Sequence, residues 1–506
     1  MIRTLIDCSH FIVVLLLISL PLTAQTAHSL DLKFETVGII STGHHAPFWH
    51  TSNRQGLPSV EKNNGYMHFA ALGNIPLPCN LDIDYSMDLG VGTGLQTNWF
   101  VHQLYIDIDY KWLGLSAGMK ERWNDKNSNL SSGALTWSGN SRPVPEIRVG
   151  IPEYVRVPIL GSWFSLKGHV GYGRLTDDRW RKEHGVGNYV EGALFHSKSG
   201  FVRIGDESRF PFEIYWGLEM NNVFGGIQFE DGIEKHLPSD AAAFRTVLFP
   251  FHHVEQQGSE DGDNFGSWHI NFSYKLKDWH FAVYYEHFFE DHSSMLGVEY
   301  KNNTQGEKGF INFGYCRNWL DGLYGVEANI PDYISFISNV VFEYMNTRGL
   351  CGPIRHSATD NLDGMYVIEE VDGRDDMYNH HIYTSDTHWG YSMGSPIMIS
   401  PVYNDDKSNR FRSNRVQMFH LGIDGDITDN ICYRVMATTT RHWGCYGFPL
   451  NDVERITSLM LEFSYWMGDS YDWKFSISGG MDIDSGDLLG NNKGVMLTIS
   501  RTWKVI

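Results

Sequence analysis

The sequence predicts an all-β protein, a transmembrane antiparallel up-and-down β-barrel with long extracellular loops. Three observations support this fold class: an N-terminal export signal, strict alternation of apolar and polar residues along the chain, and connections that are short and long in turn. A soluble β-sandwich also alternates, but it has no reason to place all its long connections at one end. We therefore expect the apolar face of each strand to meet lipid.

The first residues have the features of a secretory signal. Arg3 precedes an apolar run over residues 11–22, and small residues follow up to Ala24. About a dozen apolar residues are too few to span a bilayer, so we predict cleavage after Ala24, with Ala27 as the alternative. No linker or break in composition divides the rest, which predicts a single barrel domain over residues 25–506 in the outer membrane of a Gram-negative bacterium.

Charge and cysteine content exclude several classes of protein. A net charge of -20 argues against binding nucleic acid or anionic lipid headgroups, which both require a basic surface. Of six cysteines, five remain after cleavage, and their wide spacing matches neither a disulfide framework nor a zinc motif. A pair between Cys432 and Cys445 across a hairpin stays open.

Period-2 segments recur from end to end. Residues 81–89, 104–111, 459–465 and 473–478 each alternate, and so does the terminal segment 494–506, which we expect to close the barrel against residues 30–40. Counting such segments gives about twenty strands, with residues 295–335 the hardest to assign. If the apolar face meets lipid, these carboxylates face the lumen: Asp82, Asp84, Asp88, Asp107, Asp109, Glu286 and Glu462.

The connections differ in length in a regular way. Short ones are predicted at 74–78, 111–112, 277–278, 426–429 and 468–470, and long ones near 41–63, 120–144, 174–191, 222–266, 349–412 and 443–454. Read in order, every long loop falls on one side, as in outer-membrane barrels with short periplasmic turns.

Chemical motifs are absent or weak. Paired lumenal carboxylates could act as acid and base, but barrel lumens are commonly polar. Adjacent histidines on a strand point to opposite faces, so the pairs at 44–45, 252–253 and 380–381 do not predict a metal site. No Gly-x-Ser-x-Gly motif occurs, although a spatial serine–histidine pair stays open. We predict no catalytic residue, no metal, no cofactor and no enzymatic activity.

The long loops combine aromatic rings with directional polar groups. Rings offer flat apolar faces and the polar groups offer hydrogen bonds, which together match the two kinds of surface on a sugar. The candidate carbohydrate-binding residues are His380, His381, Tyr383, Trp389, Tyr391, Trp123, Trp137, Asn140, Arg142, Trp49 and Arg54. The alternative is that these residues fasten the loops together and plug the barrel.

Several short motifs occur in the order of a known family. They are residues 379–383 with 390–391 and Gly394, residues 343–348, 296–300, 46–49 with 53–56, and 138–145. In these motifs the chain resembles the capsule-assembly Wzi family of outer-membrane proteins, in the branch of the Bacteroides lineage. Known members carry a periplasmic helical bundle before the barrel, which we expect to be missing here.

The resemblance implies a monomeric barrel of about eighteen strands that acts as a surface lectin and attaches or organises capsular polysaccharide. Its expected partners are that polysaccharide, outer-membrane lipid and the barrel-assembly machinery, with no nucleic acid. Two alternatives remain: a saccharide-selective porin, and an outer-membrane hydrolase.

Overall fold

The computed structural model describes residues 28–505 except for 96, 162, 186, 207–208, 250–261, 291–298, 303–307, 313–319, 332–335, 351–354, 359–367, 372–375 and 469–471. The predicted signal over residues 1–24 lies outside the described residues, as does most of the 296–300 motif.

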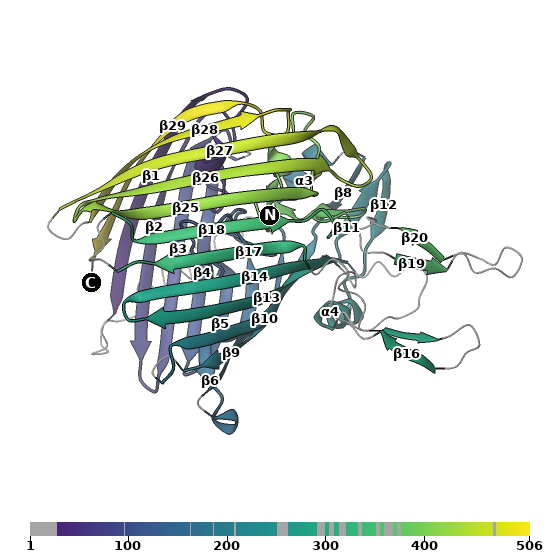
Figure 1. The fold of residues 1–506 in the computed structure, drawn as a ribbon, viewed down its shortest axis with the longest axis horizontal. Helices are drawn as coiled ribbons and strands as arrows, with labels where there is room; N and C mark the ends of the chain where they lie inside the picture. The colour runs from purple at the N-terminus through teal and green to yellow at the C-terminus, as the bar shows by residue number, and fades with distance from the viewer. Residues whose placement is uncertain are drawn as a thin grey trace, which may run out of the picture.

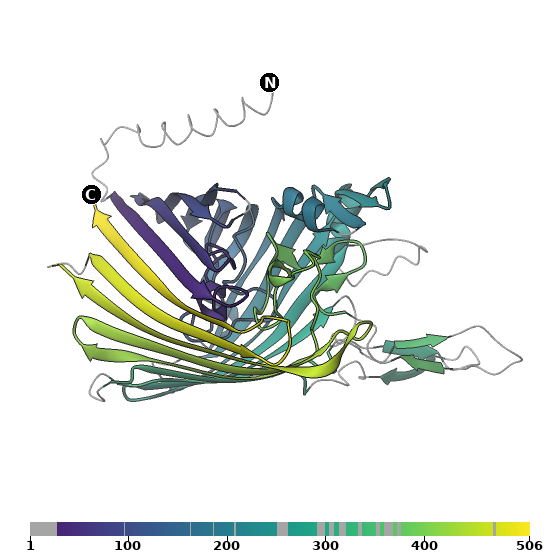
Figure 2. The ribbon, with the colours of Figure 1, turned by 90° about the horizontal axis from the view of Figure 1, so that it is seen from above.

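Eighteen antiparallel strands form one closed sheet (Figures 1 and 2). They are β1 (Ser29–Thr42), β2 (Asn63–Leu77), β3 (Leu81–Thr93), β4 (Trp99–Tyr110), β5 (Leu113–Met119), β6 (Glu146–Arg156), β7 (Phe164–Arg174), β9 (Leu194–Gly205), β10 (Phe212–Phe224), β13 (Asp263–Leu276), β14 (Trp279–Glu290), β17 (Gly322–Asn329), β18 (Asn339–Asn346), β25 (Val416–Thr428), β26 (Ile431–Gly444), β27 (Pro449–Met467), β28 (Trp473–Asp484) and β29 (Asn492–Lys504). The sheet closes where β1 pairs with β29, from Asp31↔Lys504 to Thr42↔Lys493. The predicted barrel is confirmed, with eighteen strands rather than the twenty counted from periodicity.

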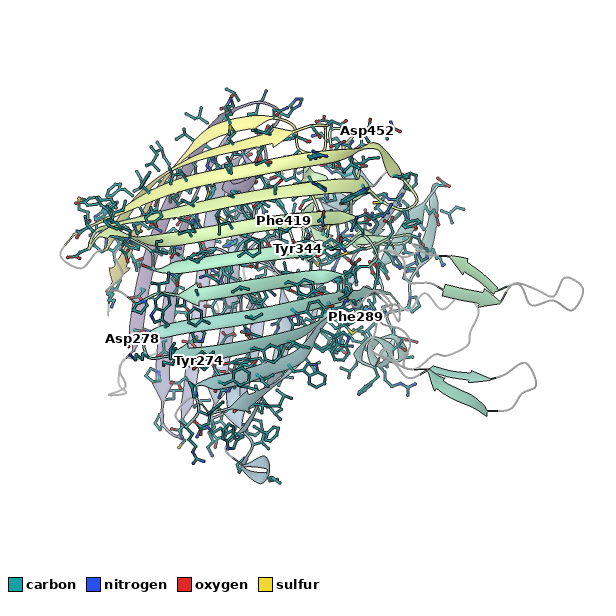
Figure 3. All side chains as sticks on the ribbon, viewed as in Figure 1. Tyr274, Asp278, Phe289, Tyr344, Phe419 and Asp452 are labelled. Carbon is teal, nitrogen blue, oxygen red and sulfur yellow. The ribbon has the colours of Figure 1, made fainter. Side chains whose placement is uncertain are left out.

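The two faces of the wall differ in chemistry. On β27, Leu461 is 44% exposed on the outer face, while Glu462 beside it is 9% exposed on the inner face. Figure 3 shows Tyr344 and Phe419 on the outer wall of neighbouring strands. A soluble protein buries its apolar face, so a sheet that exposes its apolar face and buries its polar one is built for lipid.

Connections at the two ends of the barrel are unequal. Turns at one end are short, such as 277–278 and 429–430, whereas most connections at the other end are long (Asp278 and Asp452 mark these ends in Figure 3). The long loop predicted over 443–454 is wrong, because β26 and β27 are joined by residues 445–448 only. The chain re-enters the sheet at Pro449, and Glu454 is paired with His442. A further long connection, 291–321, was not predicted.

Short helices and strands lie in the connections at the long-loop end. They are α2 (Phe48–Thr51), α3 (Asp178–His184), β8 (Asn188–Glu191), β11 (Ile227–Glu230), β12 (Ile233–His236), α4 (Ala241–Leu248), β15 (Glu299–Asn302), β16 (Lys308–Asn312), β19 (Arg355–Ala358), β20 (Ile368–Val371), β21 (Asn379–His380), β22 (Thr384–Ser385), β23 (Thr387–His388), β24 (Tyr391–Ser392) and η2 (Pro401–Tyr403); η1 (Pro158–Leu160) lies in a short turn. Among the described residues, no helix is long and apolar enough to cross a bilayer.

The cysteine pair left open by the sequence does not form. Cys432 lies near the start of β26 and Cys445 follows its last residue, so the whole length of the strand separates them, and both are free thiols. A disulfide requires Cα atoms closer than about 7 Å.

Candidate functional site

Three external segments fold back into the barrel: residues 43–62, 120–145 and 376–415, which we call the plug. Their apolar side chains form one buried cluster with inward-facing wall residues. The plug contributes Phe48, Trp49, Val60, Leu135, Trp137, Val144, Met377, Tyr378, Ile382, Tyr383, Tyr391, Met393, Ile397, Met398, Ile399, Tyr403 and Phe411. A buried cluster of this size is a hydrophobic core in the interior of the barrel, enclosed by the membrane-facing wall.

Carboxylates of the wall hold the plug by its backbone. Glu286 accepts a hydrogen bond from the backbone N–H of Leu135 at 2.7 Å, and Glu343 accepts one from Ser132 at 2.6 Å. Asp482 binds the N–H of Phe48 at 2.9 Å. Because a buried amide without a partner is costly, these inward carboxylates have a structural role as anchors of the plug.

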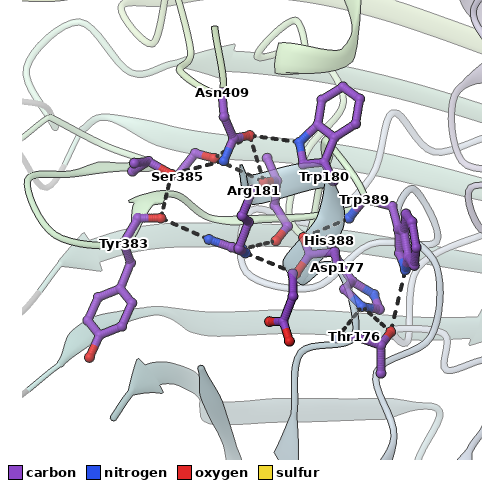
Figure 4. A network of polar contacts seen from close by, with 12 residues as sticks. Thr176, Asp177, Trp180, Arg181, Tyr383, Ser385, His388, Trp389 and Asn409 are labelled. Carbon is purple, nitrogen blue, oxygen red and sulfur yellow. Dashed lines mark hydrogen bonds and ion pairs between the residues drawn. The ribbon is translucent and has the colours of Figure 1, made fainter. Parts of the chain in front are cut away.

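A buried arginine clamps the histidine-rich segment of the plug (Figure 4). Arg181 of α3 is 1% exposed and pairs with Asp177 at 2.9 Å. It also donates to the carbonyl oxygens of Tyr383 at 2.9 Å and Thr387 at 2.7 Å. The sequence analysis missed Arg181, because nothing local distinguishes it from the exposed Arg179 on the same helix.

Other side chains of this segment tie separate loops together. His388 contacts the carbonyl oxygen of Arg142 through Nδ1 at 2.9 Å and Thr176 Oγ1 through Nε2 at 3.0 Å. Burial lowers the pKa of His388, so the ring is neutral at pH 7. Tyr391 donates to the carbonyl oxygen of Pro58 at 2.6 Å, and burial raises the pKa of its hydroxyl.

The structure separates the predicted sugar-binding residues into two groups. Six are buried, namely Trp49, Trp137, Asn140, Arg142, Tyr383 and Tyr391. Their side chains lie within the plug, where the Asn140 amide, for example, donates to the Ser392 carbonyl oxygen at 3.2 Å. Their part in binding a sugar remains a prediction.

The other five keep some exposure but do not form one site. His381 is exposed, and its ring lies 4.4 Å from that of the half-buried His380. Trp389 is half-buried, with the Arg142 guanidinium 5.2 Å from its ring centroid. Arg54 and Trp123 lie elsewhere, in the lumen.

Two chambers lie in the short-turn half of the lumen, with Trp123 bordering both. The first, of about 540 Å³, is lined by Arg54, Arg434, Glu462 and Lys474 among others. The second, of about 400 Å³, is lined by these residues among others: Lys126, Arg148, Tyr154, Tyr215 and Glu219. Trp123 is 46% exposed, which makes it the most accessible of the predicted rings in the lumen.

An accessible group of rings on the long-loop end was not predicted. Phe448 is 62% and Tyr446 is 42% exposed in the β26–β27 hairpin. The guanidinium of Arg410 lies 4.3 Å from the Phe448 ring centroid, and that of Arg415 lies 4.6 Å from Tyr446. We call these four residues the aromatic patch. The signal was present in the sequence, Trp-Gly-Cys-Tyr-Gly-Phe over 443–448, within the long external loop predicted at 443–454, but none of these residues was among the candidates.

The described part of the chain contains no candidate metal site. None of its His, Cys, Asp or Glu side chains gather in groups of three or more that could hold an ion. The expectation that the protein is metal-free remains a prediction.

No family model and no curated protein matches the sequence. Among solved structures, the barrel is similar to Escherichia coli Wzi, described as an outer membrane protein involved in group 1 capsule assembly and a carbohydrate-binding β-barrel. The two share 13% identity over 92% of this chain and 83% of that chain, with a TM-score of 0.55. Pseudomonas aeruginosa OccD3 covers 95% of this chain and 92% of its own at 10% identity, with a TM-score of 0.47. Identity this low shows only a shared fold, that of Gram-negative outer-membrane barrels.

Proposed function

We propose that this chain is an outer-membrane barrel without enzymatic activity that binds capsular or other surface polysaccharide, in capsule assembly or attachment. The apolar outer wall supports a membrane location, reached by export with a signal cleaved after Ala24. The fold shared with Wzi and the motifs of the capsule-assembly family support the ligand class. Outer-membrane lipid and the barrel-assembly machinery are the further partners proposed for a monomer.

One observation carries the proposal. In the described residues, the external loops place a packed core in the lumen, and beside that core the aromatic patch is exposed at the long-loop end. Exposed rings at the long-loop end meet the compartment that holds a capsule. Phe448 and Tyr446 offer ring faces to the C–H surface of a sugar, and Arg410 and Arg415 offer donors to hydroxyl or carboxylate groups.

A saccharide-selective porin is the second candidate, supported by the two lumenal chambers. Rings and charges line these chambers as they would line a sugar pathway. The two functions differ in electrical conductance, because a porin requires a continuous aqueous path and a plugged binding protein does not.

The experiment measures the affinity of isolated capsule fragments for the detergent-solubilised barrel. We expect Phe448→Ala to weaken binding about ten-fold or more, using the ~1–3 kcal/mol of ring stacking measured for bases as a guide. Phe272→Ala is the matched control, because Phe272 is 43% exposed on the lipid-facing wall. Bilayer conductance of the wild type is recorded alongside.

Each outcome points to one function. Loss of binding in Phe448→Ala alone supports a surface lectin. Loss in Trp123→Ala but not in Phe448→Ala places the saccharide in the lumen, and together with steady conductance it supports the porin. On cells, polysaccharide that is shed rather than absent when the gene is deleted indicates attachment.

A further inference from the structure

Two arginines face each other on the outer wall of the barrel. Arg441 of β26 is directly opposite Arg455 of β27 in the antiparallel register. Both are exposed, while the alternate residues His442 and Ile456 are buried against the plug. Since neighbours on a strand point to opposite faces, both guanidinium groups project toward the membrane side of the wall. We call them the arginine pair.

The arginine pair has no acidic partner among the described residues. Neither side chain forms an ion pair there, although Arg434 on β26 and Arg501 on β29 each do. Like charges directly opposite on a sheet destabilise it. The arrangement is therefore unfavourable unless an anion from outside the chain lies between or beside the two groups.

The arginine pair lies at the level of a lipid headgroup. Below it on β27, the outward residues Leu459, Leu461, Phe463 and Tyr465 form an apolar row, each 38–44% exposed. The ten steps from Arg455 to Tyr465 cover about 33 Å along the strand, or about 25 Å along the membrane normal at a typical tilt near 40°. That height equals the apolar band of an outer-membrane barrel, so Arg455 is at its external edge.

A third cation and an aromatic ring extend this surface. Trp443 lies two residues beyond Arg441 on the same strand, and the guanidinium of Arg348 is 4.9 Å from its ring centroid. Tryptophan is typical of the membrane–water interface. The chain has a net charge of -20, which opposes a general attraction to anionic lipid, so this local concentration of cations requires a local explanation.

We propose that Arg441 and Arg455, assisted by Arg348, bind the phosphate of a lipid headgroup in the outer leaflet. Guanidinium forks match phosphate oxygens in pairs and bind them with charge-assisted hydrogen bonds. The acyl chains of the same lipid lie along Leu459 and Phe419, which continue the wall below the arginine pair. Directly beneath the cations, Thr439 and Thr457 are flanked on the outer face by Phe419 and Ile483. The apolar surface that begins at this level distinguishes a lipid from a free anion. The inference depends on the membrane location of the barrel and not on polysaccharide binding.

The test uses native mass spectrometry of the delipidated, detergent-solubilised barrel. The probes are dioctanoyl phosphatidate, dioctanoylglycerol, inorganic phosphate and polygalacturonate. We expect wild type to retain one phosphatidate, and a variant carrying Arg441→Gln and Arg455→Gln to bind it at least ten-fold more weakly. Arg179→Gln is the matched control, because Arg179 is an exposed arginine on an external helix. Dioctanoylglycerol should not be retained.

A second measurement keeps the proposal testable if binding is hard to resolve. Without lipid, Arg441→Gln should raise the temperature at which heat-modified gel mobility is lost, because it removes the repulsion. Phosphatidate should raise that temperature for wild type and not for the double variant. Equal phosphatidate binding by wild type and double variant would overturn the proposal. So would inorganic phosphate binding as tightly as phosphatidate, which indicates a free-anion site, or displacement of the lipid by polygalacturonate, which indicates an acidic polysaccharide.

Discussion

Replacing Arg181 by Met should release the plug segment 376–415 while leaving the wall intact. The change removes the partner of buried Asp177 and two donors to the backbone, to Tyr383 and Thr387. Removing one member of a buried ion pair costs about 3–5 kcal/mol. Asp177 keeps one hydrogen bond, from the N–H of Trp389 at 3.0 Å, so we expect the lower half of that range. A cost of about 3 kcal/mol increases the open population of the segment about 100-fold.

Hydrogen exchange of residues 376–415 measures that population directly. The control is Arg179→Met on the same helix, whose exposed i,i+4 pair with Glu183 contributes only about 0.3–0.5 kcal/mol. Adding Asp177→Asn to Arg181→Met should recover part of the protection, because it removes the uncompensated charge. Heat-modified gel mobility should be unchanged in every variant. Equal exchange in the Arg181 and Arg179 variants would refute the clamp.

Three further predictions concern the wall and the plug. Leu461→Lys places a charge on the lipid face and should hinder assembly by ~2–4 kcal/mol, seen as lost heat-modified mobility, whereas inward-facing Asp84→Asn should assemble normally. Burial lowers the pKa of His50 from 6.5 to about 3, so docking of residues 43–62 should weaken by about 1.4 kcal/mol per unit as pH falls from 6.5 toward 3. The protection factors of residues 43–62, which compare observed exchange with the intrinsic rate at the same pH, should fall in acid, and less so in His50→Gln. Trp137→Ala should loosen the plug by about 3–5 kcal/mol in the same assay, without the selective loss of sugar affinity expected of a stacking platform.

The wall could be predicted from sequence because the alternation of apolar and polar residues along each strand is a local pattern. Each strand repeats every two residues, and each hairpin pairs neighbours in the chain, so Leu461 and Glu462 reveal their faces without any distant information. The error at 443–454 has a physical cause. β27 continues past the external edge of its apolar row, so outward-facing Asn451 and Arg455 and inward-facing Ile456 break the alternation while the backbone continues as a strand.

The plug could not be assigned in the same way, because its contacts join residues far apart in the chain. Arg181 donates a hydrogen bond to the carbonyl oxygen of Thr387, 206 positions later in the chain, and no local sequence pattern predicts such a contact. Residue type also does not distinguish buried loop aromatics from exposed ones. Trp137 and Phe448 are both aromatic loop residues, yet Trp137 is 9% exposed and Phe448 is 62% exposed. Burial separates the rings packed in the plug from the accessible ones, while the part of each ring in binding a sugar remains a prediction.

The range of these contacts suggests an order of assembly. Apart from the β1–β29 pairing that closes the sheet, each wall strand pairs with the wall strand next to it in the chain, while the plug anchors join residues 151 positions apart at Leu135–Glu286 and 434 apart at Phe48–Asp482. Short-range contacts close at lower entropic cost, so we expect the hairpins of the wall to pair before the plug docks. Until then, Glu286 and Asp482 must be hydrated in an open lumen, because a buried charge without partners is strongly unfavourable. The plug therefore covers these carboxylates, and any opening of the plug would expose them to solvent from the long-loop end.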